Sequence, residues 1–395
     1  MTTRIFLPEP GAASKRLQYL VAGLSQRYRE VLVLTSKYRR APRQERKGNI
    51  RILRNPVLRD KTGAVRGYIQ YLSFDIPLFF RLLTVRRPSV FICEPPPTTG
   101  VITRIAATIR RVPYVAYAAD ILSDAAETQG SHPLVCKVVR LMEKFTFGGA
   151  SRVIAVSPPV AQRVQEISGR DADVVPFGVS LPSPELLAER ETALQSWKDG
   201  EAPPRFVYAG TVAPWLGADV FLTAMPLVWE RIPDARLEYF GLGSGWEDLR
   251  ARVAALDDPR INAHDAVPVR QADVEMAQAT VTLASMQPAN YEMAYTTKML
   301  SSLAVGTPVV YAGTGLAVAD ITDFDLGEVA AHEPQQVAAA MVRILERLRA
   351  EDPQLAPERL RHWVQLNHSA AGAGELGAQV VAEAGGAEAK GNMCS

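Results

Sequence analysis

The segment from Asn290 to Tyr311, NYEMAYTTKMLSSLAVGTPVVY, decides how the rest of the chain is interpreted. Apolar residues recur with a helical period over Ala294–Ala304, and Gly306 and Pro308 end the predicted helix. The apolar run that follows predicts a buried strand. A loop that opens into a helix leaves free backbone N–H groups, and the positive end of the helix dipole, at the start of the helix.

Lys298 lies one turn inside this predicted helix start. An ammonium group beside free N–H groups is well suited to hold a diphosphate. The alternative is an ordinary strand–helix–strand unit whose lysine is solvated. The local pattern alone does not decide between the two interpretations.

The size and composition of the chain predict a globular protein of two or three domains, because it has 395 residues of which 47% are hydrophobic. We expect no transmembrane helix, since no apolar run reaches the roughly 18 residues that spanning requires. The amino-terminal residues predict a short strand and a loop rather than a signal peptide. The three cysteines and five histidines show neither disulfide nor metal spacing. We therefore expect a cytoplasmic protein without a metal site.

The charge of the chain is divided unevenly between its halves. Residues 1–180 hold 28 basic and 13 acidic residues, whereas the remainder holds 16 and 29. Basic residues are densest over residues 39–61. Scattered surface charge that only maintains solubility is the simpler explanation. An anionic partner for the first half is the explanation that we favour.

Strand-like and helix-like runs alternate along the whole chain, which predicts parallel sheets covered by helices. In the first half the predicted strands are Arg4–Leu7, Glu30–Thr35, Ile50–Arg54, Val90–Cys93, Tyr114–Ala118, Arg152–Val156 and Val174–Pro176. In the second half they are Arg205–Tyr208, Arg236–Tyr239, Ile261–Ala263, Val281–Leu283 and Pro308–Tyr311. Two such series predict an α/β fold with two Rossmann-like, doubly wound domains facing across a cleft. The predicted boundaries are 1–180 for the first domain, 181–203 for a linker, 204–384 for the second domain and 385–395 for a disordered tail.

Several loops that follow predicted strands contain small residues. Gly210 and Thr211 follow one strand, and Gly241 and Gly243 follow the next. Glycine lets a phosphate approach the backbone closely, although each loop is also explained by a plain strand-to-helix turn. The stretch around Gly11, PEPGAAS, follows the first predicted strand in the same way.

Two polar residues end predicted strands in the first half. Asp120 lies at the carboxyl end of a strand, where chemistry is usually found in such sheets, and its alternative role is that of a helix cap. Ser157 precedes two prolines and is predicted to be a helix cap. The sequence shows no serine or cysteine nucleophile motif.

In order along the chain, these motifs resemble those of a retaining glycosyltransferase of family 4, which has the GT-B fold. The resemblance covers roughly residues 4–345. It is carried by PEPGAASKRL, EPPPTTG, VPYVAYAAD, LMEKFTFGGASRVIAVS, VVPFGVSLP, FVYAGTVAPWLGADVFLTAM, PDARLEYFGLGSG and TTKMLSSLAVGTPVV.

The resemblance implies that the second domain binds a nucleotide-sugar, with UDP, GDP or dTDP as its nucleotide, as a substrate, and that no separate cofactor is needed. Lys298, Glu292 and Asp120 are its implied catalytic residues. The residues implied to contact the donor are Gly11, Ala12, Gly210, Thr211, Gly241, Gly243, Tyr295 and Ser301. The segments Phe240–Gly245 and Val267–Pro268 are implied to flank the base.

The chain also departs from the family pattern. Ser301 and Met293 stand where two glutamates are common, with Glu292 adjacent to the first position. Leu216 replaces a frequent lysine, and Ala119 replaces a frequent histidine. These departures keep a second hypothesis open, that of a non-catalytic partner subunit. A third hypothesis is another GT-B enzyme, such as a nucleotide-sugar epimerase.

The resemblance and the basic first half together suggest the partners. The form of the lysine-containing motif is similar to that of enzymes in polysaccharide and cell-surface assembly. We expect a lipid-linked acceptor at the inner membrane face, with residues 39–61 near anionic headgroups. A soluble small-molecule acceptor, such as a natural-product aglycone, is the alternative. No nucleic acid partner is expected.

Overall fold

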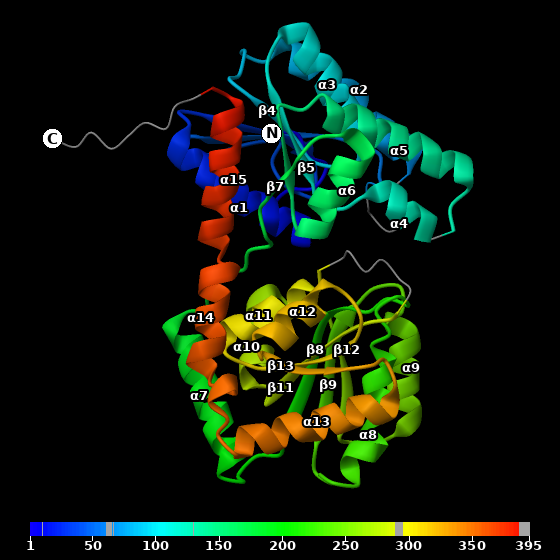
Figure 1. Ribbon diagram of the computed structural model, residues 1–395, viewed down its shortest axis with the longest axis vertical. Helices are drawn as coiled ribbons and strands as arrows, with labels where there is room; N and C mark the ends of the chain where they lie inside the picture. The colour runs from blue at the N-terminus through cyan, green and yellow to red at the C-terminus, as the bar shows by residue number, and fades with distance from the viewer. Residues whose placement is uncertain (10, 61–64, 66, 129, 289–294, 387–395) are drawn as a thin grey trace, which may run out of the picture. The chain divides into compact units, whose positions relative to one another are not determined.

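The computed structural model describes residues 1–386 except 10, 61–64, 66, 129 and 289–294 (Figure 1). The chain divides into two compact units. The first comprises Met1–Gly178 together with the segment from Ala370 onward, and the second comprises Val179–Ser369. None of the described helices is long and apolar enough to cross a membrane.

The first unit is an α/β layer built around one sheet. Its strands are β1 Val31–Ser36, β2 Gln44–Lys47, β3 Ile50–Asn55, β4 Phe91–Cys93, β5 Tyr114–Ala118, β6 Arg152–Ala155 and β7 Asp173–Val174. Its helices are α1 Ala12–Arg27, α2 Tyr68–Thr84, α3 Pro97–Arg110, α4 Leu122–Thr128, α5 Pro133–Gly148, α6 Pro158–Ser168 and α15 Ala370–Ala384.

The amino-terminal residues join the two parts of this sheet. The N–H of Thr2 donates to the Ile92 carbonyl at 2.8 Å, and the N–H of Thr3 donates to the Leu34 carbonyl at 3.1 Å. The order is therefore β2-β3-β1, then residues 1–3, then β4-β5-β6-β7. Only β2 pairs antiparallel among the described strands of this sheet. The strand order thus reverses between the amino-terminal segment and β4, which creates a switch point of the kind where ligands bind.

The second unit contains a six-stranded sheet. Its strands are β8 Arg205–Thr211, β9 Arg236–Leu242, β10 Ile261–Asp265, β11 Val281–Met286, β12 Val309–Gly313 and β13 Gly327–Ala330. Its helices are α7 Pro184–Lys198, α8 Asp219–Trp229, α9 Trp246–Leu256, α10 Val269–Gln278, α11 Thr297–Val305, α12 Leu316–Asp323, α13 Pro334–Arg349 and α14 Pro357–Asn367, with a 3₁₀ turn at Pro353–Leu355.

All pairs in this second sheet are parallel, in the order β10-β9-β8-β11-β12-β13. This is the Rossmann order 3-2-1-4-5-6, and its switch point lies between β8 and β11. Buried apolar side chains such as Phe206, Phe221 and Val281 hold helices against the sheet. The prediction of two Rossmann-like α/β domains is confirmed.

One predicted strand is wrong. The predicted strand Arg4–Leu7 does not form. Residues 1–3 instead make the backbone hydrogen bonds that fill the position between β1 and β4 in the sheet. Thr2 and Thr3 are fully buried, and the Thr2 hydroxyl donates to the Ile92 carbonyl at 3.1 Å. Polar threonines can occupy this core position because their hydroxyls find partners there.

The units also differ from the predicted domain boundaries. The predicted linker 181–203 contains α7, whose Arg190 is fully buried and donates to the carbonyl of Gly306 at 3.2 Å within the second unit. The last helix, α15, belongs to the first unit, where it packs on α1 (Figure 1). The two helices cross at glycines: a Cβ on Gly23 would lie 2.2 Å from the Gly374 carbonyl oxygen. Most of the predicted disordered tail, from residue 387 on, lies outside the described residues.

Candidate active site

The carboxyl ends of β8 and β9 bring four of the predicted donor-binding residues together. Gly210 pairs with Gly241, and Thr211 pairs with Leu242. Gly210 has a φ of 138° and Gly243 a φ of 130°, a region that favours glycine. A Cβ on Gly243 would lie 2.3 Å from the carbonyl oxygen of Val212. Gly210, Thr211 and Gly243 are exposed at the end of the sheet, whereas Gly241 is buried, and a Cβ on it would lie 2.9 Å from the Trp246 ring.

Lys298 lies in the first turn of α11 and reaches the same place. Its Nζ donates to the Tyr208 hydroxyl and lies 3.3 Å from the Thr211 carbonyl oxygen. Nζ is also 3.8 Å from the centre of the Tyr208 ring. A Cβ on Gly210 would lie 3.5 Å from the Lys298 Cε. Lysine, glycine loop and β8 thus form one local arrangement beside the switch point of the second sheet.

Lys298 lacks a compensating carboxylate among the described residues. Burial lowers its pKa to about 7, and no carboxylate in the described part of the chain raises it again. A desolvated ammonium without a counter-ion favours an anion at this position, because an anion would restore the stability of its charged form. The first turn of α11 adds the positive end of its helix dipole.

Tyr295 and Ser301 lie on either side of Lys298 in the sequence. Tyr295 is held by side-chain contacts outside α11, whereas Ser301 lies within α11. The Tyr295 hydroxyl donates to Asp320 Oδ2 at 2.5 Å, and its ring lies 5.6 Å from that of His368. Burial, together with the charge of Asp320, raises the pKa of Tyr295 well above its usual value. Ser301 is half-buried and lies one helical turn after Lys298. Tyr295 is therefore anchored to α12.

The predicted residues Glu292 and Met293 lie outside the described residues, so their prediction stays open. In the base-flanking segments, Phe240 is largely buried and packs with Val267 in a small apolar cluster. Its ring stacks on the His264 ring, with centres 4.6 Å apart. These contacts hold the two segments together, and their role toward a base stays a prediction.

In the first unit, Gly11 precedes α1 with a φ of 146°. Apart from its neighbours in the chain, no atom of the described residues lies within 4 Å of a Cβ built on Gly11, and Ala12 is exposed. The small residues thus leave open space at the start of this helix. That placement is compatible with a ligand close to the backbone.

Asp120 follows β5 in the first unit. Asp120 is an exposed residue, but protein atoms around its carboxyl group remove part of the hydration and raise its pKa to about 6. Arg16 opposes this rise and Glu94 adds to it. The start of α4 is capped by Glu143, whose Oε1 accepts from the Leu122 N–H at 2.7 Å. Glu143, rather than Asp120, therefore caps the start of α4, and the alternative prediction that Asp120 is a helix cap is wrong.

Sequence reasoning missed two charged residues beside Asp120. Arg16 donates to Glu94 Oε1 at 3.0 Å, and the Thr3 hydroxyl donates to Glu94 Oε2 at 3.0 Å. Glu94 is buried, and burial raises its pKa although Arg16 lowers it. Arg16 also lies over the Tyr117 ring at 5.1 Å. Glu94 follows a predicted strand directly, and this position was the signal that could have found it.

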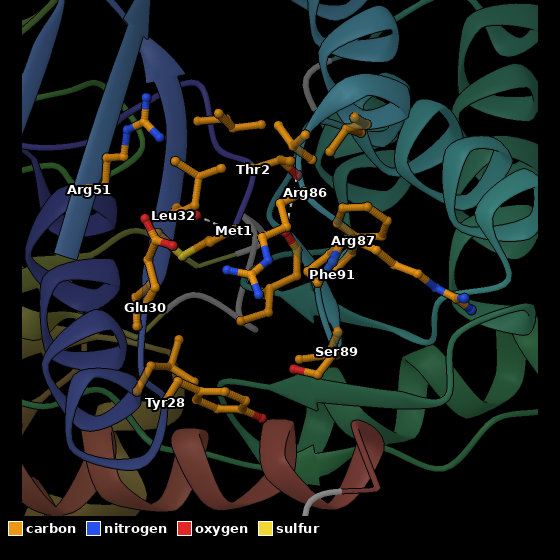
Figure 2. A pocket seen from close by; sticks show the side chains of 18 of the residues that line it. Met1, Thr2, Tyr28, Glu30, Leu32, Arg51, Arg86, Arg87, Ser89 and Phe91 are labelled. Carbon is orange, nitrogen blue, oxygen red and sulfur yellow. Dashed lines mark hydrogen bonds between the residues drawn. The ribbon is translucent and has the colours of Figure 1, made fainter. Parts of the chain in front are cut away.

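The cavities of the first unit differ in their relation to the sheet. A cavity of about 610 Å³ lies around Met1, Leu32 and Phe91 (Figure 2). It is lined by the segments that precede β1 and β4, hence it opens at the amino ends of the strands. Ligands of such sheets bind at the carboxyl ends. A much smaller pocket, lined by Glu94 and Asp120, lies at that end.

Ser157 caps α6, with its hydroxyl accepting from the Val160 N–H at 3.4 Å, as predicted. Among the described residues, no group of three histidine, cysteine, aspartate or glutamate side chains is arranged to hold a metal ion.

Comparison with known families identifies both halves of the chain. Residues 11–178 match the model of the glycosyl transferase 4-like domain, and residues 203–347 match that of glycosyl transferases group 1. No curated protein sequence gives a significant match.

Solved structures share the fold over nearly the whole chain. The HepE protein of Anabaena, in complex with UDP, matches with a TM-score of 0.66 and 15% identity over 96% of this chain and 100% of its own. WaaG, a glycosyltransferase involved in lipopolysaccharide biosynthesis, gives 0.66 and 16%, over 96% and 98%. Sucrose-phosphate synthase of Thermosynechococcus elongatus gives 0.70 and 16%, over 98% and 96%.

Proposed function

We propose that this protein, a chain of two glycosyltransferase domains, transfers a sugar from a nucleotide-sugar to an acceptor hydroxyl. In the proposed reaction the sugar retains its anomeric configuration. The observation that carries the proposal is Lys298. Its ammonium group has no counter-ion in the described part of the chain and lies beside the exposed loop of Gly210 and Thr211 at the end of β8. A diphosphate supplies the negative charge that this arrangement lacks.

The diphosphate is the leaving group of the proposed reaction. The bond from the anomeric carbon to the diphosphate oxygen breaks through an oxocarbenium-like state. The acceptor oxygen then bonds to the same face of the sugar, and its proton passes to the departing diphosphate. Lys298, the loop amides near Gly210 and the first turn of α11 stabilise the negative charge that develops on the leaving group.

The proposed acceptor site lies in the first unit. Asp120, with a pKa of about 6, is mostly ionised at neutral pH and can accept a hydrogen bond from an acceptor hydroxyl. The proposed acceptor is a lipid-linked sugar of polysaccharide or glycolipid assembly at the inner face of the membrane. The shared fold with WaaG, a glycosyltransferase involved in lipopolysaccharide biosynthesis, supports this class. A soluble small-molecule acceptor is the alternative.

A donor panel tests the proposal. Binding of UDP-, GDP- and dTDP-sugars is measured by calorimetry, and released nucleoside diphosphate is measured with lipid-linked and soluble acceptors. We expect one nucleotide class to bind and one acceptor class to accelerate release. The anomeric proton of the product, observed by NMR, should show the donor's configuration. An inverted product would refute retention, and the absence of binding and turnover across the panel would refute the transferase function.

The non-catalytic alternative is favoured by two observed positions. Leu216 and Ala119, which stand where the family often has lysine and histidine, are both buried and apolar. A partner subunit would co-purify with a second, motif-complete glycosyltransferase. Turnover by the isolated chain would exclude this alternative.

A further inference from the structure

Helix α5 carries an exposed apolar stripe in the first unit. Leu134, Val138, Leu141 and Phe145 follow one another at intervals of four, three and four residues and therefore share one face of the helix. All four are exposed to solvent, although residues of this kind are usually buried.

The two neighbouring helices extend this stripe. Helix α3 packs against both α2 and α5, so the three helices form one layer (Figure 1). Helix α2 exposes its own stripe, and α3 exposes two isoleucines. We call the ten exposed side chains, each 37–68% exposed, the apolar face: Ile69, Leu72, Ile76, Phe80, Ile105, Ile109, Leu134, Val138, Leu141 and Phe145. A surface with this many large exposed apolar side chains indicates a site that contacts a membrane or another protein.

The charge of these helices is one-sided. The sequences of α2, α3 and α5 contain only two acidic residues, Asp75 and Glu143. Both are buried and bonded internally: Asp75 accepts from the Thr99 hydroxyl at 2.6 Å, and Glu143 caps α4. The other ionisable side chains in the helices and directly after them are mostly arginine and lysine: Arg81, Arg86, Arg87, Arg104, Arg110, Arg111, Lys137, Arg140 and Lys144.

Some of these cations contact the apolar face directly. The Arg104 guanidinium lies 4.0 Å from the centre of the Phe145 ring. Lys137 and Lys144 are exposed on α5 beside the stripe, whereas Arg140 is paired with Asp124 at 3.1 Å. Long basic side chains beside exposed leucine and isoleucine form the pattern of helices that lie in a membrane interface, with the cations at the phosphate level.

We propose that the apolar face and its basic rim, formed by Arg104, Lys137 and Lys144, bind an anionic lipid bilayer, into which α2, α3 and α5 insert their exposed apolar side chains. The positive charge beside the apolar face favours an anionic bilayer over a second copy of this chain. A bilayer offers phosphates at every position of the rim and hydrocarbon beneath them. A second copy of this chain would place two sets of like charges against each other. The proposal goes beyond sugar transfer, and it is tested without donor or acceptor.

The surface differs from the basic segment 39–61 that the sequence suggested. Within that segment, Arg54 is buried and paired with Glu45 at 2.7 Å, and Arg59 is paired with Glu9 at 2.9 Å. These two cations are already compensated inside the protein. Other cations of the segment, among them Arg39, Arg40 and Arg43, are exposed, but Leu58 is the one exposed large apolar side chain among its described residues. The layer of α2, α3 and α5 therefore combines exposed cations with a much larger exposed apolar area.

Vesicle flotation of the full chain tests the proposal. The vesicles contain either equal parts phosphatidylglycerol and phosphatidylcholine or phosphatidylcholine alone. We expect the protein to float with the anionic vesicles at low salt and to remain unbound with the neutral ones. The variant L134Q/L141Q should lower the partition coefficient about 100-fold or more, because each leucine that reaches the acyl boundary contributes about tenfold. The control L256Q/L366Q removes two leucines of similar exposure from the second unit and should bind like the wild type.

A second pair of variants tests the charge. K137E/K144E should lower the partition coefficient about 25-fold or more, since each basic residue near an anionic surface contributes about fivefold. The control R231E/R236E makes the same charge change on the exposed surface of the second unit and should lower binding far less.

Melting curves and circular dichroism spectra confirm that each variant is folded. The proposal is overturned when the wild type does not float with anionic vesicles, floats equally with neutral ones, or floats unchanged after L134Q/L141Q. It is also overturned when ultracentrifugation shows a dimer that L134Q/L141Q dissociates while no vesicle binds, because the face would then join two copies of the chain.

Discussion

The side-chain nitrogen of Lys298 donates a hydrogen bond to the hydroxyl of Tyr208, a residue 90 positions away. That hydroxyl in turn donates to the Thr211 carbonyl at 2.8 Å. The lysine is thus fixed over the end of β8 by a buried tyrosine that also fixes the loop. One buried hydroxyl therefore positions both the lysine and the loop of the candidate site in the second unit.

The first prediction concerns pH. Burial lowers the pKa of Lys298 to about 7 in the free protein, so its neutral form predominates above pH 7. A diphosphate stabilises the ammonium form, so binding takes up a proton. Affinity for a nucleotide-sugar should be highest below pH 7 and fall by up to about tenfold per pH unit above it. Calorimetry in buffers of different ionisation enthalpy measures the proton uptake. A flat affinity profile from below to well above the pKa of Lys298 would contradict this account.

The Tyr208 hydroxyl should support both the lysine and the loop. Tyr208→Phe removes two hydrogen bonds, and we expect a loss of roughly 1–2 kcal/mol in the free energy of unfolding together with a severalfold rise in donor Kd. Tyr239→Phe is the matched control, since Tyr239 is equally buried and donates to the Ala218 carbonyl at 3.0 Å. It should lose similar stability with donor Kd unchanged. Equal donor affinity in both variants would show that Tyr208 has no role in the site.

Gly243 should be required by the loop after β9. Gly243→Ala places a Cβ 2.3 Å from the Val212 carbonyl oxygen at a φ of 130°, so the loop must move. We expect donor Kd to rise about tenfold or more. Gly200→Ala is the control, because Gly200 has a φ of 76° and open space around it. It should cost about 1 kcal/mol of stability without affecting the donor. The idea fails when the two variants bind donor equally well.

The pair of Arg16 and Glu94 should stabilise the first unit. Arg16→Met leaves a buried carboxylate without its cation, and we expect a loss of about 3 kcal/mol in the free energy of unfolding. Arg16→Met with Glu94→Gln removes both charges and should recover part of that loss. Urea unfolding of the two single variants and the double variant measures the coupling. Strictly additive losses would mean that the two charges do not interact.

The sequence predicted the fold well where local patterns decide. The apolar run Tyr114–Ala118 is strand β5 with those bounds, and Gly306 ends α11 in the left-handed conformation expected of it. It failed where tertiary contacts decide. The buried threonines at the amino terminus look polar, and the Thr2 hydroxyl finds its partner 90 residues away. Strand β2, QERK, has no apolar alternation because it is an exposed antiparallel edge.

The candidate site also contains features that the sequence could predict and features that it could not. Lys298 and the glycines were predictable, because chain order places them after strands of a parallel sheet. The contact between Lys298 and Tyr208 was not, since a tyrosine within a strand is typical of the core. The pair of Arg16 and Glu94 was missed for a similar reason: it joins residues 78 positions apart.

The most direct test of the central claim, that Lys298 holds the donor diphosphate, is nucleoside diphosphate release by Lys298→Ala with the best donor and acceptor of the panel. We predict a fall of about 100-fold or more in kcat/KM. Lys298→Arg should keep more activity than Lys298→Ala. The control is Lys198→Ala, which removes a lysine at the end of α7 that is paired with Glu351, and it should behave like the wild type. An unchanged kcat/KM in Lys298→Ala, with the variant folded and the donor bound as tightly, would contradict the account.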